Sequence, residues 1–210
     1  MKEPAILPID HPHAIQQAVS LVKSGGMIAF PTDTVYGIGV SAFQADAIER
    51  IYQVKERSAL KAIPILLGDA ETAQQITPPF TPLVRILSEK FWPGPLTLIV
   101  PLLSSLPGNL SPLPTIGLRV PDHGFTRSLL RETGPLAATS ANLSGKPSAL
   151  SADEVRAQLG SRVDLILDGG RSPGEKASTV LDCSKDKPQL LREGPLAWQE
   201  IKEVLQDVGP

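Results

Sequence analysis

The feature that most constrains the fold is a series of short apolar segments separated by turn signals and amphipathic stretches. Examples are MIAF at 27–30, LTLIV at 96–100 and VDLILD at 163–168. Segments of this kind, bounded by Gly, Pro, Asp or Ser, predict buried β-strands. Helical stretches fall between them without strict alternation. We therefore predict a single α/β domain over residues 1–210, with a twisted mixed parallel and antiparallel sheet and flanking helices.

Local signals predict where several elements begin and end. Asp10 is expected to cap a first helix that ends at the glycine pair 25–26. Thr81 precedes a proline at the first helical position of another helix, and Ser151 opens a capping box. The glycines at 37 and 39 are interpreted as flexible backbone that turns beneath the preceding strand.

Composition limits the class of protein. The net charge of −2 argues against a general nucleic-acid coat, which would be basic, so any cationic function is expected to be local. The single cysteine, Cys183, forms no internal disulfide and favours a reducing compartment. No apolar run reaches the roughly 18 residues of a membrane span, and the N-terminus lacks signal-peptide features. We expect a cytoplasmic protein outside the membrane.

Several predicted strands end in hydroxyl or basic side chains. The strand at 27–30 is followed by TDT at 32–34, and the strand that begins at 136 continues into TSAN at 139–142. Arg119 lies within a strand, where a charge requires a partner. Ligands in open α/β sheets bind at strand ends, and converging hydroxyl and basic groups suit an anion such as a nucleotide phosphate.

Other catalytic patterns have weak support. The stretch 37–42 fits GxGxxA, but its glycines do not form the tight turn directly after the strand, and no acidic residue follows at the required distance. Ser58 to Lys61 matches SxxK by letters alone, and the three histidines lack metal-ligand spacing. We predict no metal site. A site rich in binding groups and poor in nucleophiles suits a reaction whose substrate brings the nucleophile, as in transfer at phosphorus.

Seven fragments follow one another between Ile15 and Gly194: GGMIAFPTDTVYGIG, the KxR at 55–57, FWPGPLTLIV, TIGLRVP, TSANLSGKPSA, DGG with a later glycine and STVLD, and LLREG. Together they resemble the YrdC-like family of threonylcarbamoyl-AMP synthases. The resemblance implies a YrdC-like fold around a concave, positively charged cavity. It also implies that L-threonine and bicarbonate form a carbamate, which attacks the α-phosphate of ATP, with Mg²⁺, to give threonylcarbamoyl-AMP and pyrophosphate.

The same resemblance implies residue roles. Thr34 and Arg119 would hold threonine, with Arg119 as the partner of its carboxylate. Contacts to ATP would come from Arg57, Lys61, Thr115, Ser140, Asn142, Ser148 and Arg192. Lys55 would add charge near the phosphates, and Lys55, Arg57 and Arg119 form the predicted catalytic set. No protein ligand of magnesium is implied.

The sequence departs from the family pattern at three places. Many relatives have Pro-Leu or Gly-Leu where this chain has Ala62-Ile63, and many have a threonine-contacting histidine at the position of Leu66. Some members use a threonine hydroxyl where Ala138 stands. These differences concern recognition of the amino acid more than recognition of the nucleotide.

Partners and alternatives follow from the family as well. Downstream proteins transfer the threonylcarbamoyl group to tRNA, and some members have been described as binding double-stranded RNA. We expect the short form, without a C-terminal extension. The alternative is a nucleotide- or double-stranded-RNA-binding paralogue without synthase activity. The intact Ser140-Ala141-Asn142 favours the enzyme.

Overall fold

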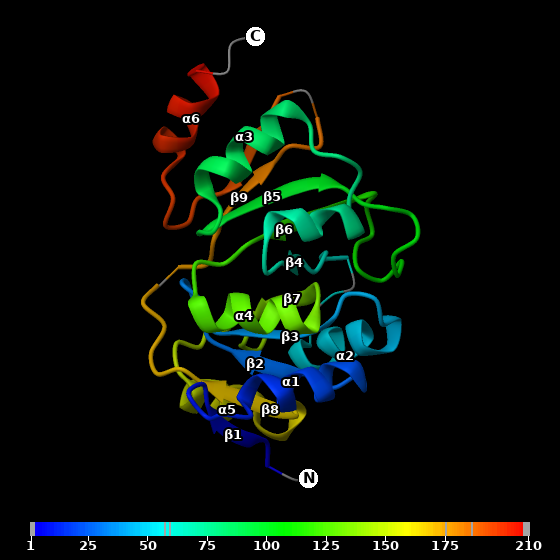
Figure 1. Cartoon of the computed structure of the whole chain (residues 1–210), viewed down its shortest axis with the longest axis vertical. Helices are drawn as coiled ribbons and strands as arrows, with labels where there is room; N and C mark the ends of the chain where they lie inside the picture. Colours follow the sequence, from blue (N-terminus) through cyan, green and yellow to red (C-terminus); the bar gives the residue numbers. More distant parts are fainter. Residues whose placement is uncertain (1–2, 57, 59, 175, 186, 208–210) are drawn as a thin grey trace.

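The computed structural model describes residues 3–56, 58, 60–174, 176–185 and 187–207. In this part of the chain, ten strands form one mixed sheet in the order β1-β8-β2-β3-β7-β4-β6-β5-β9-β10 (Figure 1). The strands are β1 (Ala5–Pro8), β2 (Ile28–Phe30), β3 (Gly37–Ser41), β4 (Ile65–Leu66), β5 (Leu96–Pro101), β6 (Thr115–Arg119), β7 (Leu136–Ser140), β8 (Leu165–Asp168), β9 (Thr179–Asp182) and β10 (Gln189–Arg192). The predicted mixed α/β sheet is confirmed.

The α-helices are α1 (Ala14–Lys23), α2 (Ala45–Lys55), α3 (Pro82–Phe91), α4 (Gly124–Thr133), α5 (Ala152–Leu159) and α6 (Trp198–Asp207). Two 3₁₀ helices, η1 (Ala70–Gln75) and η2 (Gly160–Arg162), complete the described elements. The N-terminal strand and the C-terminal helix lie at opposite ends of the molecule's long axis (Figure 1).

Two hydrophobic clusters cover the two faces of the sheet. Helices α1 and α4 pack together over one face, around Phe30, Leu136 and Leu165. Helices α2, α3, α5 and α6 contribute to the cluster on the other face, around Ile38 and Leu98. Because side chains alternate along a strand, each strand serves both faces.

The structure corrects some local predictions. Helix α1 begins at Ala14 with His13 as its N-cap and no side-chain cap, so the prediction that Asp10 caps it is wrong. Thr81 and Ser151 do cap α3 and α5, by accepting hydrogen bonds from the backbone N–H three residues on. In the predicted capping box, the Glu154 carboxylate accepts from Leu150 N–H, one residue before the cap.

The strand β3 was missed because its glycines were interpreted as a flexible turn. Gly37 and Gly39 pair with β2 and β7 in antiparallel ladders. A Cβ atom at Gly39 would lie 3.0 Å from the ring of Phe30, so the missing side chain lets that ring cross the strand. This antiparallel setting also removes the dinucleotide interpretation of GxGxxA, which requires a turn that opens a helix.

Asp69 links the segment after β4 to α4 through ion pairs with two arginines, so the stability of the fold is expected to depend on pH in the acid range. Its carboxylate accepts hydrogen bonds from Arg131 Nε (2.6 Å) and Arg127 Nη2 (3.0 Å). The bond from Arg131 is the main cause that lowers the pKa of Asp69 from 3.8 to about 2. A carboxylate with a lowered folded pKa stabilises the fold above its unfolded pKa and loses that effect as pH falls through the folded pKa.

We therefore expect Asp69→Asn to lower the melting temperature at neutral pH. The difference from wild type should shrink as pH falls from about 4 to about 2, because wild-type Asp69 then becomes neutral too. Differential scanning calorimetry over this range checks the prediction. A difference that stayed constant down to the lowest pH would contradict it.

Candidate functional site

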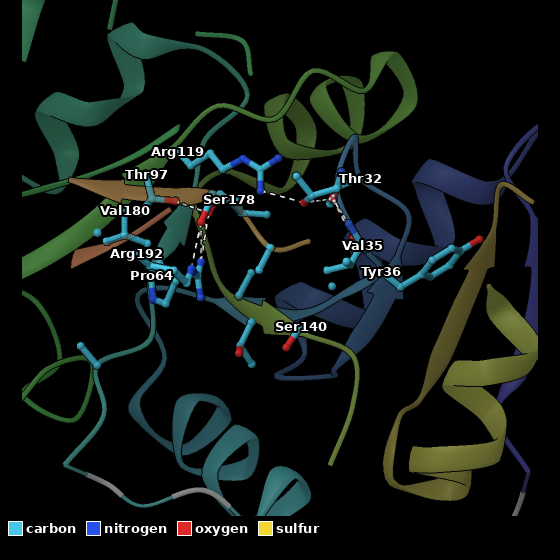
Figure 2. A pocket seen from close by; sticks show the side chains of 18 of the residues that line it. Thr32, Val35, Tyr36, Pro64, Thr97, Arg119, Ser140, Ser178, Val180 and Arg192 are labelled. Atoms are coloured by element: carbon cyan, nitrogen blue, oxygen red, sulfur yellow. Dashed lines mark hydrogen bonds between the residues drawn. The ribbon is translucent and has the colours of Figure 1, made fainter. Parts of the chain in front are cut away.

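A cavity of about 310 Å³ opens on the sheet face that carries α1 and α4 (Figure 2). Leu66 and Ala138 line the cavity and also belong to the cluster under these two helices. The described lining residues are Thr32, Thr34, Val35, Tyr36, Gly37, Ala62, Pro64, Leu66, Thr97, Ile99, Gly117, Arg119, Ala138, Thr139, Ser140, Ala177, Ser178, Val180 and Arg192.

Small side chains keep the floor of the cavity open. On β6, residues 115, 117 and 119 share one face, since side chains alternate along a strand. A Cβ atom at Gly117 would lie 2.8 Å from the Cγ2 atom of Thr97 on the neighbouring strand. The glycine therefore clears space in front of Arg119, which is at the end of the same strand.

The TDT segment forms a turn that its own first hydroxyl holds. Thr32 Oγ1 accepts hydrogen bonds from Thr34 N (3.1 Å) and Val35 N (3.3 Å) and donates to Val35 O (2.7 Å). Side-chain hydroxyls that bond nearby backbone in this way stabilise turns. The hydroxyls of Thr32 and Thr34 are 3.0 Å apart, and both side chains line the cavity.

Arg119 is a buried cation with three fixed contacts. Its Nε donates to Gly94 O (3.0 Å), its Nη1 donates to Thr34 Oγ1 (3.0 Å), and its Nη2 forms an ion pair with the Asp33 carboxylate. Burial lowers the pKa of Arg119, and the charge of Asp33 opposes that shift. The mid-strand arginine thus has the partner that its position required. Five N–H groups on a guanidinium leave two for a ligand.

A second arginine, Arg192, lines the same cavity, and in addition to burial its charge contributes to lowering the pKa of Arg119. Arg192 Nε and Nη2 both donate to Ser178 O, at 3.0 and 2.8 Å. The Ser178 hydroxyl lies 2.8 Å from the Thr97 hydroxyl on the cavity floor. Arg192 Nη1 has no hydrogen-bond partner among the described residues, which leaves it available to an anion. Figure 2 shows Arg119 and Arg192 on the same cavity, with Ser140 across from them.

Lys55 supports the loop that follows β7. The residue is only 2% exposed, and its ammonium donates to the backbone oxygens of Ser140 and Asn142. Ser140 Oγ in turn donates to Asn142 Oδ1, and the Asn142 amide donates to Lys146 O (2.7 Å). Lys55 and Asn142 therefore shape the loop from behind, while Ser140 reaches the cavity.

Four of the predicted site residues line one cavity: Thr34, Arg119, Ser140 and Arg192. Arg57 lies outside the described residues. The assigned roles of all these residues stay predictions.

Three other predicted residues lie at the margin. Thr115 begins β6, on the face of Arg119 but outside the described lining. Lys61 is exposed and adjacent to Ala62, a lining residue. Ser148 is partly buried in a loop whose next residue accepts a hydrogen bond from Tyr36 N (2.9 Å).

Sequence reasoning assigned no role to Asp33, Thr97 or Ser178. The signal for Asp33 was present, because a charge within a strand requires a counter-charge. Thr97 and Ser178 gave no usable signal, since their proximity depends on the parallel pairing of β5 with β9.

Gly174 contacts the backbone of the TDT turn and gives a second prediction. A Cβ atom there would lie 2.5 Å from Thr34 O and 2.6 Å from Thr34 Cα. Backbone atoms cannot yield as a flexible side chain does, so Gly174→Ala should displace the turn and cost about 1–3 kcal/mol in unfolding free energy. Chemical denaturation measures the loss. Gly108→Ala is the matched control, since no atom lies within 4 Å of its added Cβ; equal losses in both variants would contradict the prediction.

Two further observations concern only the described ranges. None of the helices there is both long and apolar enough to cross a bilayer. No group of three or more His, Cys, Asp or Glu side chains there is arranged to hold a metal ion. Cys183 is buried, which raises its pKa to about 12 and keeps it a thiol at neutral pH.

The fold and site define an α/β protein with a two-arginine cavity on one face of a mixed sheet. A family model named Sua5_yciO_yrdC, with the description "Telomere recombination", matches residues 20–194. The chain belongs to this family, as its sequence fragments predicted. The threonylcarbamoyl-AMP synthase of Bacillus subtilis is 41% identical to it over an alignment of 202 positions, which covers 93% of this chain and 57% of that protein.

Solved structures agree. Pyrococcus abyssi Sua5 in complex with L-threonine superposes with a TM-score of 0.88 at 36% identity, over 91% of this chain and 57% of that one. Escherichia coli YciO gives a TM-score of 0.82 at 30% identity, over 94% of this chain and 98% of that one. The chain thus spans little more than half the length of the Bacillus and Pyrococcus relatives and nearly all of YciO.

Proposed function

We propose that this chain is an L-threonylcarbamoyladenylate synthase, a nucleotidyltransferase. The observation that carries the proposal is the cavity itself, whose lining brings together Thr34, Arg119, Ser140 and Arg192. Support also comes from the B. subtilis relative, which is named threonylcarbamoyl-AMP synthase, and from the P. abyssi relative, which was crystallised with L-threonine.

The amino-acid half would lie at Arg119. A planar guanidinium matches a carboxylate with two parallel hydrogen bonds, and two of its N–H groups are left by the contacts described above. The Thr34 hydroxyl, already bonded to Arg119 Nη1, would give the amino acid a second polar contact. Leu66 and Ala138 supply the apolar wall beside this end.

The nucleotide half would lie toward Ser140 and Arg192. ATP would enter as its magnesium complex, as the family resemblance implies. Arg192 Nη1 would contact phosphate oxygens, and the loop held by Lys55 would present the Ser140 hydroxyl to the nucleotide. Arg57, Lys61, Thr115 and Ser148 retain their predicted ATP contacts as part of the proposal.

The reaction needs no protein nucleophile. Threonine and bicarbonate give N-carboxythreonine and water. An oxygen of this carbamate forms a bond to the α-phosphorus of ATP, the bond from that phosphorus to the bridging oxygen breaks, and pyrophosphate leaves. The protein's contribution would be to align the two anions and to stabilise the charge that develops on the phosphoryl oxygens.

Pyrophosphate release tests the proposal. The purified chain should release pyrophosphate from Mg·ATP only when L-threonine and bicarbonate are both present, and mass spectrometry should show threonylcarbamoyl-AMP. Omission of either co-substrate should abolish the signal. Release that ignored threonine, or no release in the complete mixture, would contradict the proposal.

The paralogue without synthase activity is the weaker candidate. The relatives from B. subtilis, at 41% identity, and from P. abyssi, at 35% identity, are both named threonylcarbamoyl-AMP synthase. We propose that the product passes to proteins that transfer the threonylcarbamoyl group to tRNA in the cytoplasm. Direct binding to tRNA or double-stranded RNA would show an affinity that falls steeply with salt. The net charge of −2 favours at most a local contact.

A further inference from the structure

Asp33 stands in the middle of the TDT turn, but it points away from the cavity. The side chains on either side of it, Thr32 and Thr34, line the cavity, whereas Asp33 is not among the described lining residues. Its side chain is 13% exposed, and its carboxylate pairs with Arg119 Nη2. Asp33 therefore contacts the cavity only through the guanidinium of Arg119.

The contacts of Arg119 come from three directions. Gly94 O holds Nε, Thr34 Oγ1 holds Nη1, and Asp33 holds Nη2. Both terminal nitrogens bond to the TDT turn, and Figure 2 shows the bond from Nη1 to that turn. Only the ion pair supplies a charge to this buried cation among its bonded partners, so it does most to fix the guanidinium plane.

The turn that carries Asp33 is braced from behind by α4. Thr126 Oγ1 donates to Pro31 O (2.6 Å), and His123 Nδ1 accepts from Thr126 N (3.3 Å) at the first turn of α4. Thr126 is fully buried. Asp33 is thus carried on a segment fixed at its start by a helix and within the turn by the Thr32 hydroxyl.

We propose that Asp33 is a positioning residue: it orients Arg119 so that the free edge of the guanidinium faces the substrate's carboxylate. The inference rests on the proposed function, whose amino-acid half it deepens. A carboxylate held equally in ground state and transition state lowers KM without changing kcat. Loss of the orientation should therefore appear mainly in the KM for threonine.

The direct test is Asp33→Asn, which keeps the shape and removes the charge. We expect the KM for L-threonine to rise about 10- to 100-fold, the scale of a displacement near 1 Å, with the KM for ATP and kcat changed less than about threefold. Asp69→Asn is the matched control, since it also removes a carboxylate paired with arginine, but outside the cavity. It should leave the KM for threonine unchanged.

A double-mutant cycle separates positioning from direct contact. In an Arg119→Lys background, which lacks the planar fork, Asp33→Asn should change the KM for threonine less than about twofold. An equal increase in both backgrounds would mean that Asp33 contacts the substrate itself, and an unchanged KM in the single variant would mean that it has no role. Either result overturns the proposal.

Two further variants and readouts guard against other failures. If Asp33→Asn does not fold, Asp33→Glu keeps the pair's charge but moves the carboxylate by one methylene; it should still raise the KM, and an unchanged KM would overturn the proposal. A crystal structure of the Asp33→Asn or Asp33→Glu variant needs no activity. In that structure the guanidinium of Arg119 should no longer bond to Thr34. This result is expected even if the wild-type chain releases no threonine-dependent pyrophosphate, so it tests the positioning role apart from the proposed function.

Discussion

Arg119→Ala is expected to lower kcat/KM for threonine by about 100-fold or more, because loss of one partner of a buried, charged hydrogen-bonded pair costs about 2–5 kcal/mol in binding. Arg119 is 5% exposed and bonds to Thr34, Asp33 and Gly94 at the end of the cavity assigned to the amino acid. Its removal takes away the carboxylate partner and also leaves Asp33 as an uncompensated, mostly buried charge. Breaking such a pair costs about 3–5 kcal/mol in unfolding free energy.

The stability loss and the loss of activity must be separated. Arg119→Lys keeps a positive charge for Asp33 but lacks the planar fork that binds a carboxylate through two hydrogen bonds. It should therefore retain most of the stability and still lose at least about 10-fold in kcat/KM for threonine. A tenfold loss corresponds to about 1.4 kcal/mol of transition-state free energy. Steady-state kinetics with denaturation curves measure both. Full activity in a folded Arg119→Ala variant would show that Arg119 does not bind the substrate.

Lys55→Met is expected to have the second-largest effect. The methionine side chain fills similar space without an ammonium. The Ser140 and Asn142 backbone oxygens would then lose the donor that the Lys55 ammonium supplies. Ser140 O keeps the hydrogen bond from Asn142 N (2.9 Å), so Asn142 O is the acceptor that loses its donor. A buried acceptor left unsatisfied lowers the unfolding free energy by about 1–3 kcal/mol.

The catalytic effect of Lys55→Met should be on the nucleotide side. The loop carries Ser140, so its displacement should raise the KM for ATP more than the KM for threonine, with a fall in kcat/KM of about 10- to 100-fold. Kinetics at varied ATP and thermal unfolding give the two readouts. A variant that unfolded early but kept both KM values would show that Lys55 serves stability alone.

The sequence predicted the sheet and most helices because short apolar runs and caps are local signals. Thr81 before Pro82 and Ser151 before α5 are examples that the structure confirms. The strand β3 escaped prediction because its glycines look like a turn, and only the packing of Phe30 across them reveals a strand. Asp10 failed as a cap because a competing local turn, in which Ala14 N donates to His11 O, precedes α1.

The sequence indicated which types of residue form the site, but not which of them contact one another. The partner of Arg119 was expected from charge alone, but its identity depends on the TDT turn folding back toward β6. Lys55 looks like a phosphate-contacting cation in the sequence, whereas in the fold its ammonium bonds the loop of Ser140. No sequence pattern distinguishes a lysine that faces a ligand from one that supports the residue in front of it.

The central claim is that one cavity binds the amino acid at Arg119 and the nucleotide near Ser140 and Arg192 at the same time. A crystal structure of the chain with ATP and L-threonine tests it most directly. We expect the threonine carboxylate within hydrogen-bond distance of the Arg119 guanidinium, with ATP phosphates on the side of Arg192. Threonine or ATP bound away from this cavity, with Arg119 still contacting only Asp33, Thr34 and Gly94, would contradict the account.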